Sequence, residues 1–480
     1  MKTTNTFLVL LTVLAFSNLF TQPAVEWTKT YLGTGDRTGG YVVQQTKDNG
    51  YIMGGCIKFQ NWRYEKAWCV KTDSMGDTIW TKWYDIERAD NIYSVEETDD
   101  GGYILGGFTQ HFNFGYAFLI KTDSSGNILW LKKIQPGIAP YGIVDTDCYS
   151  LLKTSDGGYM IAGKIYHLYT PSWNGDGYLM KIGSNGNRDW TKTFGGSEQD
   201  YFRAMKQTQD GGYILAGVTF STGAGYADGW LVKTDSLGNA LWEKTYGTSA
   251  SDYLFCMHQT NDQGYILAGF TQSSGSGDIW LIKTDSMGNP VWTKTFGGER
   301  MEQAQCVKET PSGGYIILGS GYIYGASQLN PWLIRTDTSG DSIWTKVFST
   351  GTGHSIKQTN DGGYIIAATM GDEACLIKLA FDPTSIKLEK NIPNKFTLSQ
   401  NYPNPFNPST TIEFDLPKTT EVSLRIFNIL GEKVATLISD RLSAGSYSYD
   451  WDASNLASGV YLYRLQAGDY VETRKMVLIR

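Results

Sequence analysis

Residues 200–247 read DYFRAMKQTQDGGYILAGVTFSTGAGYADGWLVKTDSLGNALWEKTYG, and this stretch decides the fold. It contains four runs rich in aromatic and branched residues that favour β-strands, namely DYFRAMKQT, YILAGVTF, GWLVKTD and ALWEKTYG. Gln-Asp-Gly-Gly separates the first two runs and Ser-Leu-Gly-Asn the last two. These are tight-turn sequences, because glycine and asparagine adopt positive φ at low cost. The stretch therefore predicts four antiparallel strands joined by two hairpins and one longer loop.

The same pattern recurs along the chain at spacings of 49 to 56 residues. A Gly-Tyr-Ile string, once Gly-Tyr-Met, places its tyrosine at Tyr51, Tyr103, Tyr159, Tyr213, Tyr265, Tyr315 and Tyr364. A Trp-x-Lys string begins at Trp27, Trp80, Trp130, Trp190, Trp242, Trp292 and Trp344. A Lys-Thr-Asp-Ser-x-Gly string begins at Lys71, Lys121, Lys233 and Lys283, with variants at Lys181 and Arg335. Seven four-stranded units of this length are typical of the blades of a β-propeller.

The two ends of the repeat region are offset from each other. The region begins with a lone fourth strand around Trp27 and ends with a third strand, ACLIKLAF, at residues 374–381. We expect the first strand of the mature chain to complete the seventh unit, because this closes a ring and removes exposed sheet edges. The sequence predicts an all-β fold: a seven-bladed β-propeller of four-stranded blades over residues 23–381, closed by its N-terminal strand.

The repeat columns indicate how the blades pack. A column of small residues lies on the first strands, where sheets crowd towards an axis: Val42, Ser94, Ser150, Ala204, Cys256, Cys306 and Ser355. The third and fourth strands resemble the repeats of quinoprotein-like and WD40-like propellers, in which a turn precedes a tryptophan that docks between blades. Asp235, Gly238 and Trp242 match that pattern. The resemblance concerns the structural repeat only, so no cofactor is predicted.

The N-terminal segment is predicted to be a signal peptide, residues 1–22. Lys2 gives it a positive start, and Phe7–Phe16 is an apolar run too short to span a bilayer. No other apolar run reaches membrane length, so we expect no transmembrane segment. The sequence therefore indicates an exported protein.

The repeats stop at the C-terminal end, where a linker is predicted at residues 382–394. Residues 395–480 contain alternating strand-like runs with Gly and Asn turns, which predicts a small Ig-like β-sandwich. The strings NYPNPFNP (401–408), ILGE (429–432), LASGVY (456–461) and KMVL (475–478) closely resemble type A C-terminal sorting domains of the type IX secretion system. This resemblance implies the type IX secretion machinery as a partner, transport across the outer membrane, and a secreted or cell-surface location. It also implies that the sorting signal includes Gly459, Tyr461, Lys475, Val477 and Leu478.

Charge and motifs exclude several kinds of chemistry. The net charge of −7 disfavours nucleic-acid binding, which needs a basic face. The four histidines share no repeat column, no Cys-x-x-Cys pair occurs, and no phosphate-binding loop is present. Asp residues at the Asp-Ser-x-Gly turns are expected to cap backbone N–H groups rather than hold calcium. The sequence thus predicts no catalytic residues, no metal and no cofactor.

The best candidate binding surface is the face opposite the tight turns, where the connecting loops vary in length. These loops carry aromatic residues, namely Trp62, Tyr64, Phe112, Phe114, Tyr169, Trp173, Tyr226, Tyr322 and Tyr324. Acidic residues precede the first strands and are expected around the mouth of the central channel: Asp90, Asp147, Asp200, Asp252 and Glu302. Variable loops on a rigid scaffold often carry function. Equally, the aromatic residues could cover the blade tops and the acids could bond to neighbouring turns.

These observations favour a binding scaffold over an enzyme, with a glycan, a cell-surface polymer or a surface protein as ligand. One alternative is a polysaccharide hydrolase or lyase that uses channel-mouth carboxylates such as Asp200 and Asp252, since such enzymes need a pair of carboxyl groups. Another is a purely structural surface component without a ligand.

Overall fold

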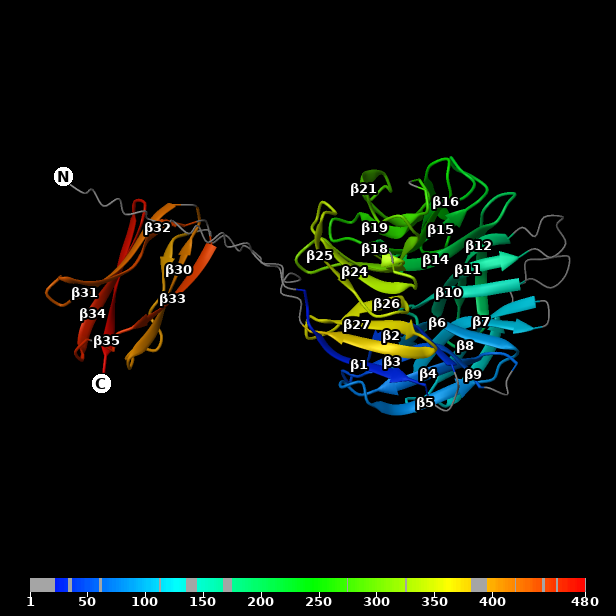
Figure 1. Ribbon diagram of the computed structural model, residues 1–480, viewed down its shortest axis with the longest axis horizontal. Helices are drawn as coiled ribbons and strands as arrows, with labels where there is room; N and C mark the ends of the chain where they lie inside the picture. Colours follow the sequence, from blue (N-terminus) through cyan, green and yellow to red (C-terminus); the bar gives the residue numbers. More distant parts are fainter. Residues whose placement is uncertain are drawn as a thin grey trace, which may run out of the picture. The chain divides into compact units, whose positions relative to one another are not determined.

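The structure is a computed structural model, and it describes residues 22–32, 37–59, 63–111, 114–134, 145–166, 175–273, 275–323, 326–380, 395–418, 420–442, 445–454 and 456–479. It divides into two compact units, residues 1–386 and 387–480 (Figure 1). The predicted linker and all but Gln22 of the predicted signal peptide lie outside the described residues.

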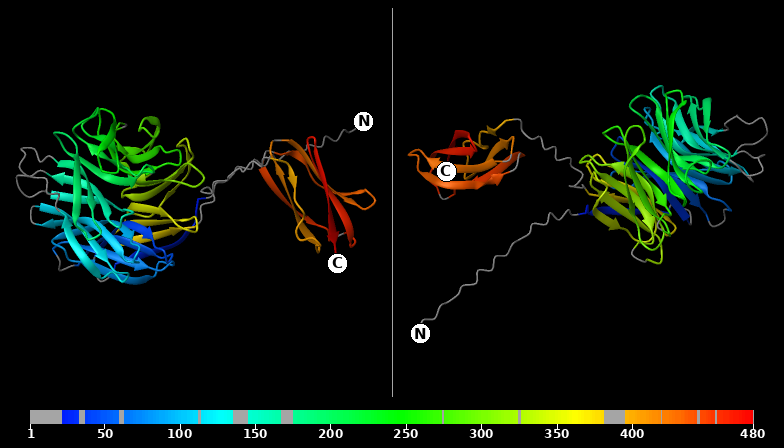
Figure 2. Two further views of the ribbon diagram at one scale, coloured as in Figure 1. Left: turned by 180° about the vertical axis from the view of Figure 1, so that it is seen from behind. Right: turned by 90° about the horizontal axis from the view of Figure 1, so that it is seen from above.

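Unit 1 contains seven sheets of four antiparallel strands, which confirms the predicted fold class (Figures 1 and 2). The first four blades are β2 (Arg37–Gln45), β3 (Tyr51–Lys58), β4 (Lys66–Thr72) and β5 (Thr78–Tyr84); β6 (Ala89–Glu97), β7 (Tyr103–His111), β8 (Phe114–Thr122) and β9 (Ile128–Ile134); β10 (Asp145–Lys153), β11 (Tyr159–Tyr166), β12 (Gly175–Ile182) and β13 (Arg188–Phe194); and β14 (Asp200–Gln207), β15 (Tyr213–Thr219), β16 (Asp228–Thr234) and β17 (Ala240–Tyr246). The last three are β18 (Asp252–Gln259), β19 (Tyr265–Thr271), β20 (Asp278–Thr284) and β21 (Pro290–Phe296); β22 (Glu302–Glu309), β23 (Tyr315–Gly321), β24 (Asn330–Thr336) and β25 (Ser342–Val347); and β26 (Thr352–Gln358), β27 (Tyr364–Met370) and β28 (Glu373–Leu379), completed by β1 (Val25–Tyr31).

The N-terminal strand closes the ring. β1 pairs antiparallel with β28, with Trp27 opposite Lys378. The backbone N–H of Thr38 in blade 1 donates to the carbonyl of Asp372 in blade 7 at 2.8 Å. The first strands β2, β6, β10, β14, β18, β22 and β26 each contact the next one around the ring, so they are the innermost strands. They therefore surround the central channel.

On six of the seven fourth strands, a tryptophan docks against a glycine of a turn in the next blade. Trp27 lies against Gly76, where an added Cβ would come within 2.8 Å of the indole ring, and Trp242 lies against Gly288 in the same way. Both glycines have φ near +78°, in the left-handed region that favours glycine (φ 79° and 77°). Because Trp27 makes at the closure the contact that Trp242 makes inside the ring, the blade 7–blade 1 interface is built like the others.

Each blade is also held by a buried cation under its first hairpin. Lys233 is 6% exposed, and its Nζ lies 2.8 Å from Asp210 of the Gln-Asp-Gly-Gly turn. The same Lys–Asp pair recurs in five other blades. In blade 6 both partners differ: Arg335 donates to Ser312 Oγ at 2.6 Å. The repeated Lys and Asp columns are therefore explained by packing within the blade.

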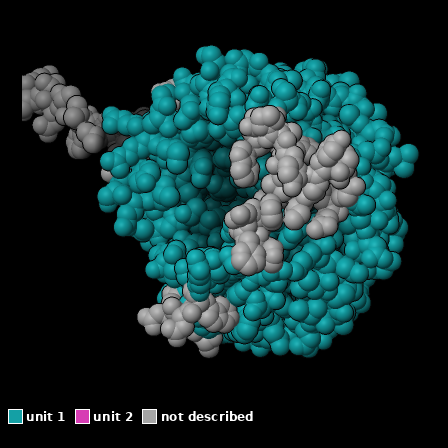
Figure 3. All heavy atoms as spheres, turned by 90° about the vertical axis from the view of Figure 1, so that its right-hand side faces the viewer, with its two compact units in different colours: residues 1–386 teal, residues 387–480 magenta. Residues whose placement is uncertain are grey.

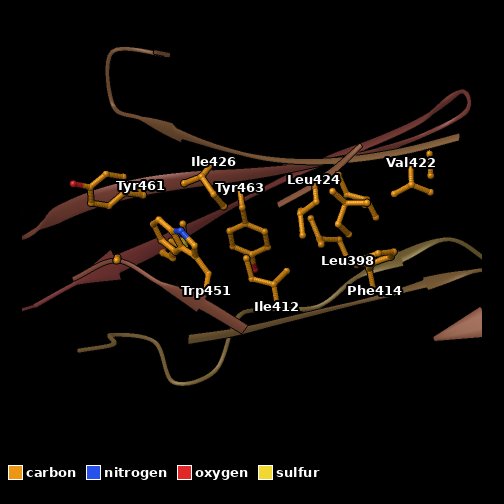
Figure 4. Packing of buried hydrophobic residues seen from close by; sticks show 14 of the residues in the cluster. Leu398, Ile412, Phe414, Val422, Leu424, Ile426, Trp451, Tyr461 and Tyr463 are labelled. Atoms are coloured by element: carbon orange, nitrogen blue, oxygen red, sulfur yellow. The ribbon is translucent and has the colours of Figure 1, made fainter. Parts of the chain in front are cut away.

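Unit 2 is a small β-sandwich, as predicted. One sheet has the order β29 (Thr397–Leu398), β30 (Ser409–Leu416), β33 (Gly445–Asp452), and the other β32 (Lys433–Leu442), β31 (Thr420–Asn428), β34 (Gly459–Ala467), β35 (Tyr470–Leu478). Its core contains Ile412, Phe414, Leu424, Trp451 and Tyr463 from both sheets (Figure 4). Alternate residues along each strand supply this core, as expected for two packed sheets.

Candidate functional site

The predicted loop aromatic residues are only partly described. Trp62, Phe112, Tyr169, Trp173 and Tyr324 lie outside the described residues, as does the side chain of Phe114 at the start of β8. Tyr226 is 74% exposed and meets Phe220 edge to face at 5.3 Å. The three described rings, Tyr64, Tyr226 and Tyr322, belong to blades 1, 4 and 6.

Two of these rings have cationic neighbours. The Arg63 and Arg88 guanidinium groups lie 5.3 Å and 5.4 Å from the centre of the Tyr64 ring. Arg300 lies 5.4 Å from the ring centre of Tyr322, and both line a cavity of about 400 Å³ beside blade 6. No contact joins Tyr64, Tyr226 and Tyr322 to one another within the described parts of the loops, so they form separate surface features.

The five acidic residues are buried, whereas the sequence suggested that they gather around the mouth of the channel; Asp147 alone contacts a side chain of the channel, that of Tyr149. Asp90, Asp200 and Asp252 have no exposed surface, Glu302 is 2% exposed and Asp147 is 7% exposed. The carboxylates of four of them accept hydrogen bonds from the loops that enter the first strands, as the alternative with acids bonded to neighbouring turns expects: Asp90, Asp200, Asp252 and Glu302. Asp147 instead accepts one from the Tyr149 hydroxyl on β10.

The individual contacts show how these carboxylates are held, although Asp252 Oδ1 is buried with no hydrogen-bond partner among the described residues. Asp200 accepts hydrogen bonds from Gly196 N at 2.8 Å and Ser221 Oγ at 2.7 Å. Asp252 accepts one from Thr248 N at 2.6 Å. Burial raises the pKa of Glu302, which accepts from a backbone N–H of its loop. The geometry of Asp200 and Asp252 therefore does not favour the acid–base pair of a hydrolase or lyase.

The central channel holds a set of side chains that the sequence did not single out. One residue of each first strand is left out of the ladder by a β-bulge: Tyr41, Tyr93, Tyr149, Arg203, Phe255, Gln305 and His354. A bulge leaves one residue unpaired and redirects its side chain. We call these seven residues the aromatic collar.

The aromatic collar is nearly continuous around the axis. Tyr93 lies between Tyr41 and Tyr149, with ring centres 5.7 Å apart on both sides. Arg203 lies 4.3 Å from the ring centre of Tyr149, and His354 lies 5.2 Å from Tyr41. All seven, with Gln303, line a cavity of about 410 Å³. Figure 3 shows a hollow near the centre of one face of unit 1, as expected for a propeller with an open channel mouth.

Burial sets the protonation of the aromatic collar. It lowers the pKa of His354 to about 4 and raises that of Tyr93 to about 12. Both side chains are therefore neutral at pH 7, and Arg203 carries the fixed positive charge. Among the described residues no carboxylate lies within salt-bridge distance of Arg203. The aromatic collar thus offers ring faces, side-chain amides and one guanidinium to a ligand.

On the innermost strands a second ring is formed by the residues three positions beyond the bulge, towards the tight-turn face, which share one register position in all seven blades: Gln44, Glu96, Leu152, Lys206, His258, Lys308 and Lys357. We call Lys206, Lys308 and Lys357, with His258, the basic belt. The lysines act on one another across the channel: Lys308 lowers the pKa of Lys357, and it is the largest cause that lowers the pKa of Lys206 to about 8. Burial, followed by the three lysines, lowers the pKa of His258 to about 3.

The sequence contained a signal for these channel residues. Each aromatic collar residue directly precedes a member of the small-residue column. Each second-ring residue lies three positions after its collar residue. The collar varies from blade to blade, so no repeated string marks it. His258 and His354 share no repeat column, because His354 belongs to the collar and His258 to the second ring. Their strands β18 and β26 both belong to the innermost strands around the axis, so the two residues lie at different depths.

The predicted sorting residues come together at the final hairpin of unit 2. Gly459 pairs with Leu478 at the open end of β34 and β35, and the Tyr461 hydroxyl donates to the Ala457 carbonyl at 2.8 Å. Leu478 is 1% exposed. Val477 N donates to Asn404 Oδ1 at 2.9 Å, and the Lys475 carbonyl accepts from Gln400 Nε2 at 2.9 Å. The Asn-Tyr-Pro-Asn-Pro-Phe-Asn-Pro segment therefore fastens the last strand.

Within the described part of the chain, no group of three or more His, Cys, Asp or Glu side chains is placed to hold a metal ion. Likewise, none of the described segments forms a helix long and apolar enough to span a bilayer.

Comparison with known proteins identifies the C-terminal unit. Residues 400–479 match the family model described as a secretion system C-terminal sorting domain. This match indicates sorting by the type IX system and a secreted or cell-surface protein. A search of curated protein sequences gives no match.

Solved structures similar to this chain include propellers. The WD40 β-propeller domain of Doa1 is 12% identical, with 75% of this chain and 98% of that chain covered and a TM-score of 0.45. Puromycin hydrolase is 11% identical, with 80% of this chain and 59% of that chain covered and a TM-score of 0.46. PorZ, a surface component of the type IX secretion system of Porphyromonas gingivalis, is 10% identical, with 93% of this chain and 76% of that chain covered and a TM-score of 0.22. At these identities and TM-scores the likeness carries no functional information.

Proposed function

We propose that the type IX secretion machinery carries this protein across the outer membrane, and that the propeller then acts as a non-catalytic scaffold that binds a glycan or surface-protein ligand from its variable-loop face. The observation that carries the proposal is the aromatic collar and its cavity of about 410 Å³. Cavities of this size, lined by aromatic side chains with a few polar groups, are typical of small-ligand sites.

The topology gives the ligand its direction of approach. Each first strand begins at the variable-loop face and ends at a tight turn, so a ligand from that face meets the aromatic collar before the basic belt. The exposed rings Tyr64, Tyr226 and Tyr322 are approached from the same side. A long ligand could contact both the loops and the collar, whereas a small one would bind the collar alone.

Binding without catalysis follows from the chemistry available. The collar can stack and donate or accept hydrogen bonds, but Tyr93 and His354 keep one protonation state near pH 7. A general acid or base works best when its pKa lies near the working pH. The carboxylate nearest the collar, Asp147, accepts a hydrogen bond from the Tyr149 hydroxyl. These groups favour recognition over acid–base chemistry.

A glycan array with the full chain tests the binding part of this proposal. We expect Tyr93→Ala and Arg203→Ala each to weaken binding of the retained glycans roughly tenfold or more, since stacking and a charged hydrogen bond are lost. Trp83→Ala, on the outermost strand of blade 1, is the matched control and should bind normally. If collar variants bind as well as the wild type while Tyr226→Ala and Tyr322→Ala do not, the site lies on the loops and not in the channel.

Export is tested separately in cells with a working type IX system. Removing residues 395–480 should leave the propeller inside the outer membrane, and Tyr461→Ala with Leu478→Ala should reduce export while the control Lys433→Ala, at the start of β32, should not. Appearance of the truncated propeller in the medium at the wild-type level would contradict this part of the proposal.

A further inference from the structure

Two positions of the repeat carry cations, and only one of them is required by the fold. The Lys of the third strand occurs in six blades and is replaced by Arg335 in blade 6, so that cation belongs to the architecture. The second channel ring, in contrast, carries lysine in only three blades, at Lys206, Lys308 and Lys357. Gln44 and Leu152 occupy the same position in blades 1 and 3. The fold therefore accepts a neutral residue at this position.

These three lysines converge from separate blades. Lys206 of blade 4 is affected by the charges of Lys308 in blade 6, Lys357 in blade 7 and Glu96 in blade 2. The geometry agrees: Lys206, Lys308 and Lys357 occupy the same register position on β14, β22 and β26, which belong to the ring of innermost strands. Like charges held together in a partly dehydrated space reduce stability unless an anion joins them.

Among the described residues, Glu96 and the Cys306 thiol oppose the charge of these lysines, since both raise the pKa values of Lys206 and Lys357. Glu96 is the one carboxylate of the second ring, and it accepts a hydrogen bond from Gln44 Nε2 at 3.2 Å. Asp147, beside the collar, accepts one from the Tyr149 hydroxyl at 2.8 Å. Arg203 and the three lysines thus face two carboxylates. The channel is positive inside a chain of net charge −7.

His258 adds a polar group to the same level. Its Nδ1 is buried and has no hydrogen-bond partner among the described residues. A buried polar atom without a partner costs free energy. A ligand that reaches the basic belt would relieve this cost as well as the repulsion between the lysines.

From this arrangement we infer that the channel binds the acidic end of a glycan, with the sugar ring held by the aromatic collar and its carboxylate or sulfate group held by Lys206, Lys308 and Lys357. This inference rests on the proposed function and specifies its ligand. The side-chain amides of Gln303 and Gln305 both donate and accept, as sugar hydroxyls require. The cavity size matches one or two sugar units better than a folded protein surface.

Calorimetric titration of the full chain tests the inference with four probes: digalacturonic acid, a sulfated galactose disaccharide, neutral galactobiose, and a tripeptide of glutamate. We expect at least one acidic sugar to bind, and to bind roughly tenfold to a hundredfold more tightly than galactobiose. Lys308→Met and Lys357→Met should each remove most of this difference. Lys244→Met, on the outermost strand β17, is the matched control and should leave it unchanged. Raising the salt concentration should weaken acidic-sugar binding.

The outcomes separate this inference from the proposed function. If acidic and neutral sugars bind with equal affinity and Tyr93→Ala still abolishes binding, the ligand is not specifically an acidic glycan. The collar would remain a sugar-binding site. Tighter binding of the glutamate tripeptide than of either acidic sugar would overturn the glycan class. If no probe binds and Tyr93→Ala changes nothing on the glycan array, both the inference and the binding proposal fail.

Discussion

At the scale of single residues, the channel lysines are placed where they reduce stability. The pKa of Lys206 is lowered to about 8, first by Lys308 and then by burial and Lys357. A lysine whose folded-state pKa lies below its unfolded value near 10.4 destabilises the folded protein below about pH 8. That penalty fades as the pH rises towards 10. Groups that cost stability are often retained for binding.

Lys308→Met should therefore stabilise the free protein. We expect the free energy of unfolding at pH 7 to rise by about 1 kcal/mol relative to wild type, because the repulsion felt by Lys206 and Lys357 is reduced. The gain should shrink as the pH approaches 10, because Lys206 of the folded wild type is then neutral and no longer repelled by Lys308. Denaturant unfolding at the two pH values measures this, with Lys244→Met as control. A variant less stable than wild type at pH 7 would show that Lys308 has a structural role.

The collar also shows at this scale what sequence reasoning could not reach. Tyr41, Arg203 and His354 have nothing in common as residue types, and only their position before the small column relates them. Their convergence depends on a bulge in each first strand, and no residue pattern marks a bulge. The acidic residues show the opposite error: Asp200 and Asp252 stand at the expected place in the chain, but their side chains turn inward to loop N–H groups.

At the scale of elements, the hairpin turns and the buried cation act together. The four strands of residues 200–247 were predictable, because turn residues and branched or aromatic runs alternate so regularly. The reason for the Lys and Asp columns could not be predicted. Lys233 and Asp210 lie 23 positions apart in the sequence, and they come together only after β15 and β16 have paired. In blade 6 both positions of this pair differ, with Ser312 in place of the Asp and Arg335 in place of the Lys. The same contact explains why, because Arg335 donates a hydrogen bond directly to Ser312.

Asp210→Ala should destabilise blade 4. Lys233 stays buried without its carboxylate, and we expect a loss of about 2 kcal/mol, less than for a fully buried pair because Asp210 is partly exposed. The hydrogen bond from Lys233 lowers the pKa of Asp210 to about 2, so its contribution is present above about pH 4 and is lost as the pH falls towards 2. Thermal unfolding at pH 7 and at pH 2.5 measures both effects. Adding Lys233→Met should restore part of the stability; if the double variant is no better than Asp210→Ala, the buried charge is not the cause.

At the scale of the whole molecule, the closed ring creates the channel. The offset of the repeat ends predicted that the N-terminal strand joins the last blade, and β1 pairs with β28. Unit 2 folds around its own core and supplies the sorting motifs. The sequence could indicate the export route directly, because the sorting motifs are contiguous strings, whereas the channel site is assembled from seven separate strands.

Trp27→Ala tests ring closure. Trp27 contacts Gly76 and Tyr51 of blade 1, and Trp242 makes the same contacts with Gly288 and Tyr265. Both substitutions should lower the free energy of unfolding by a similar amount, about 2 to 3 kcal/mol. Denaturant unfolding compares them. A large loss for Trp242→Ala with none for Trp27→Ala would mean that the N-terminal strand is not part of a closed ring.

The channel site is tested most directly by a crystal structure of the full chain with whichever acidic disaccharide binds more tightly in the titration. We expect electron density for the sugar inside the channel, with a ring against Tyr93 or Tyr149 and its carboxylate or sulfate within hydrogen-bond distance of Lys308 or Lys357. Density for the sugar only on the outer loops, or a channel filled with solvent at saturating ligand, would contradict this expectation.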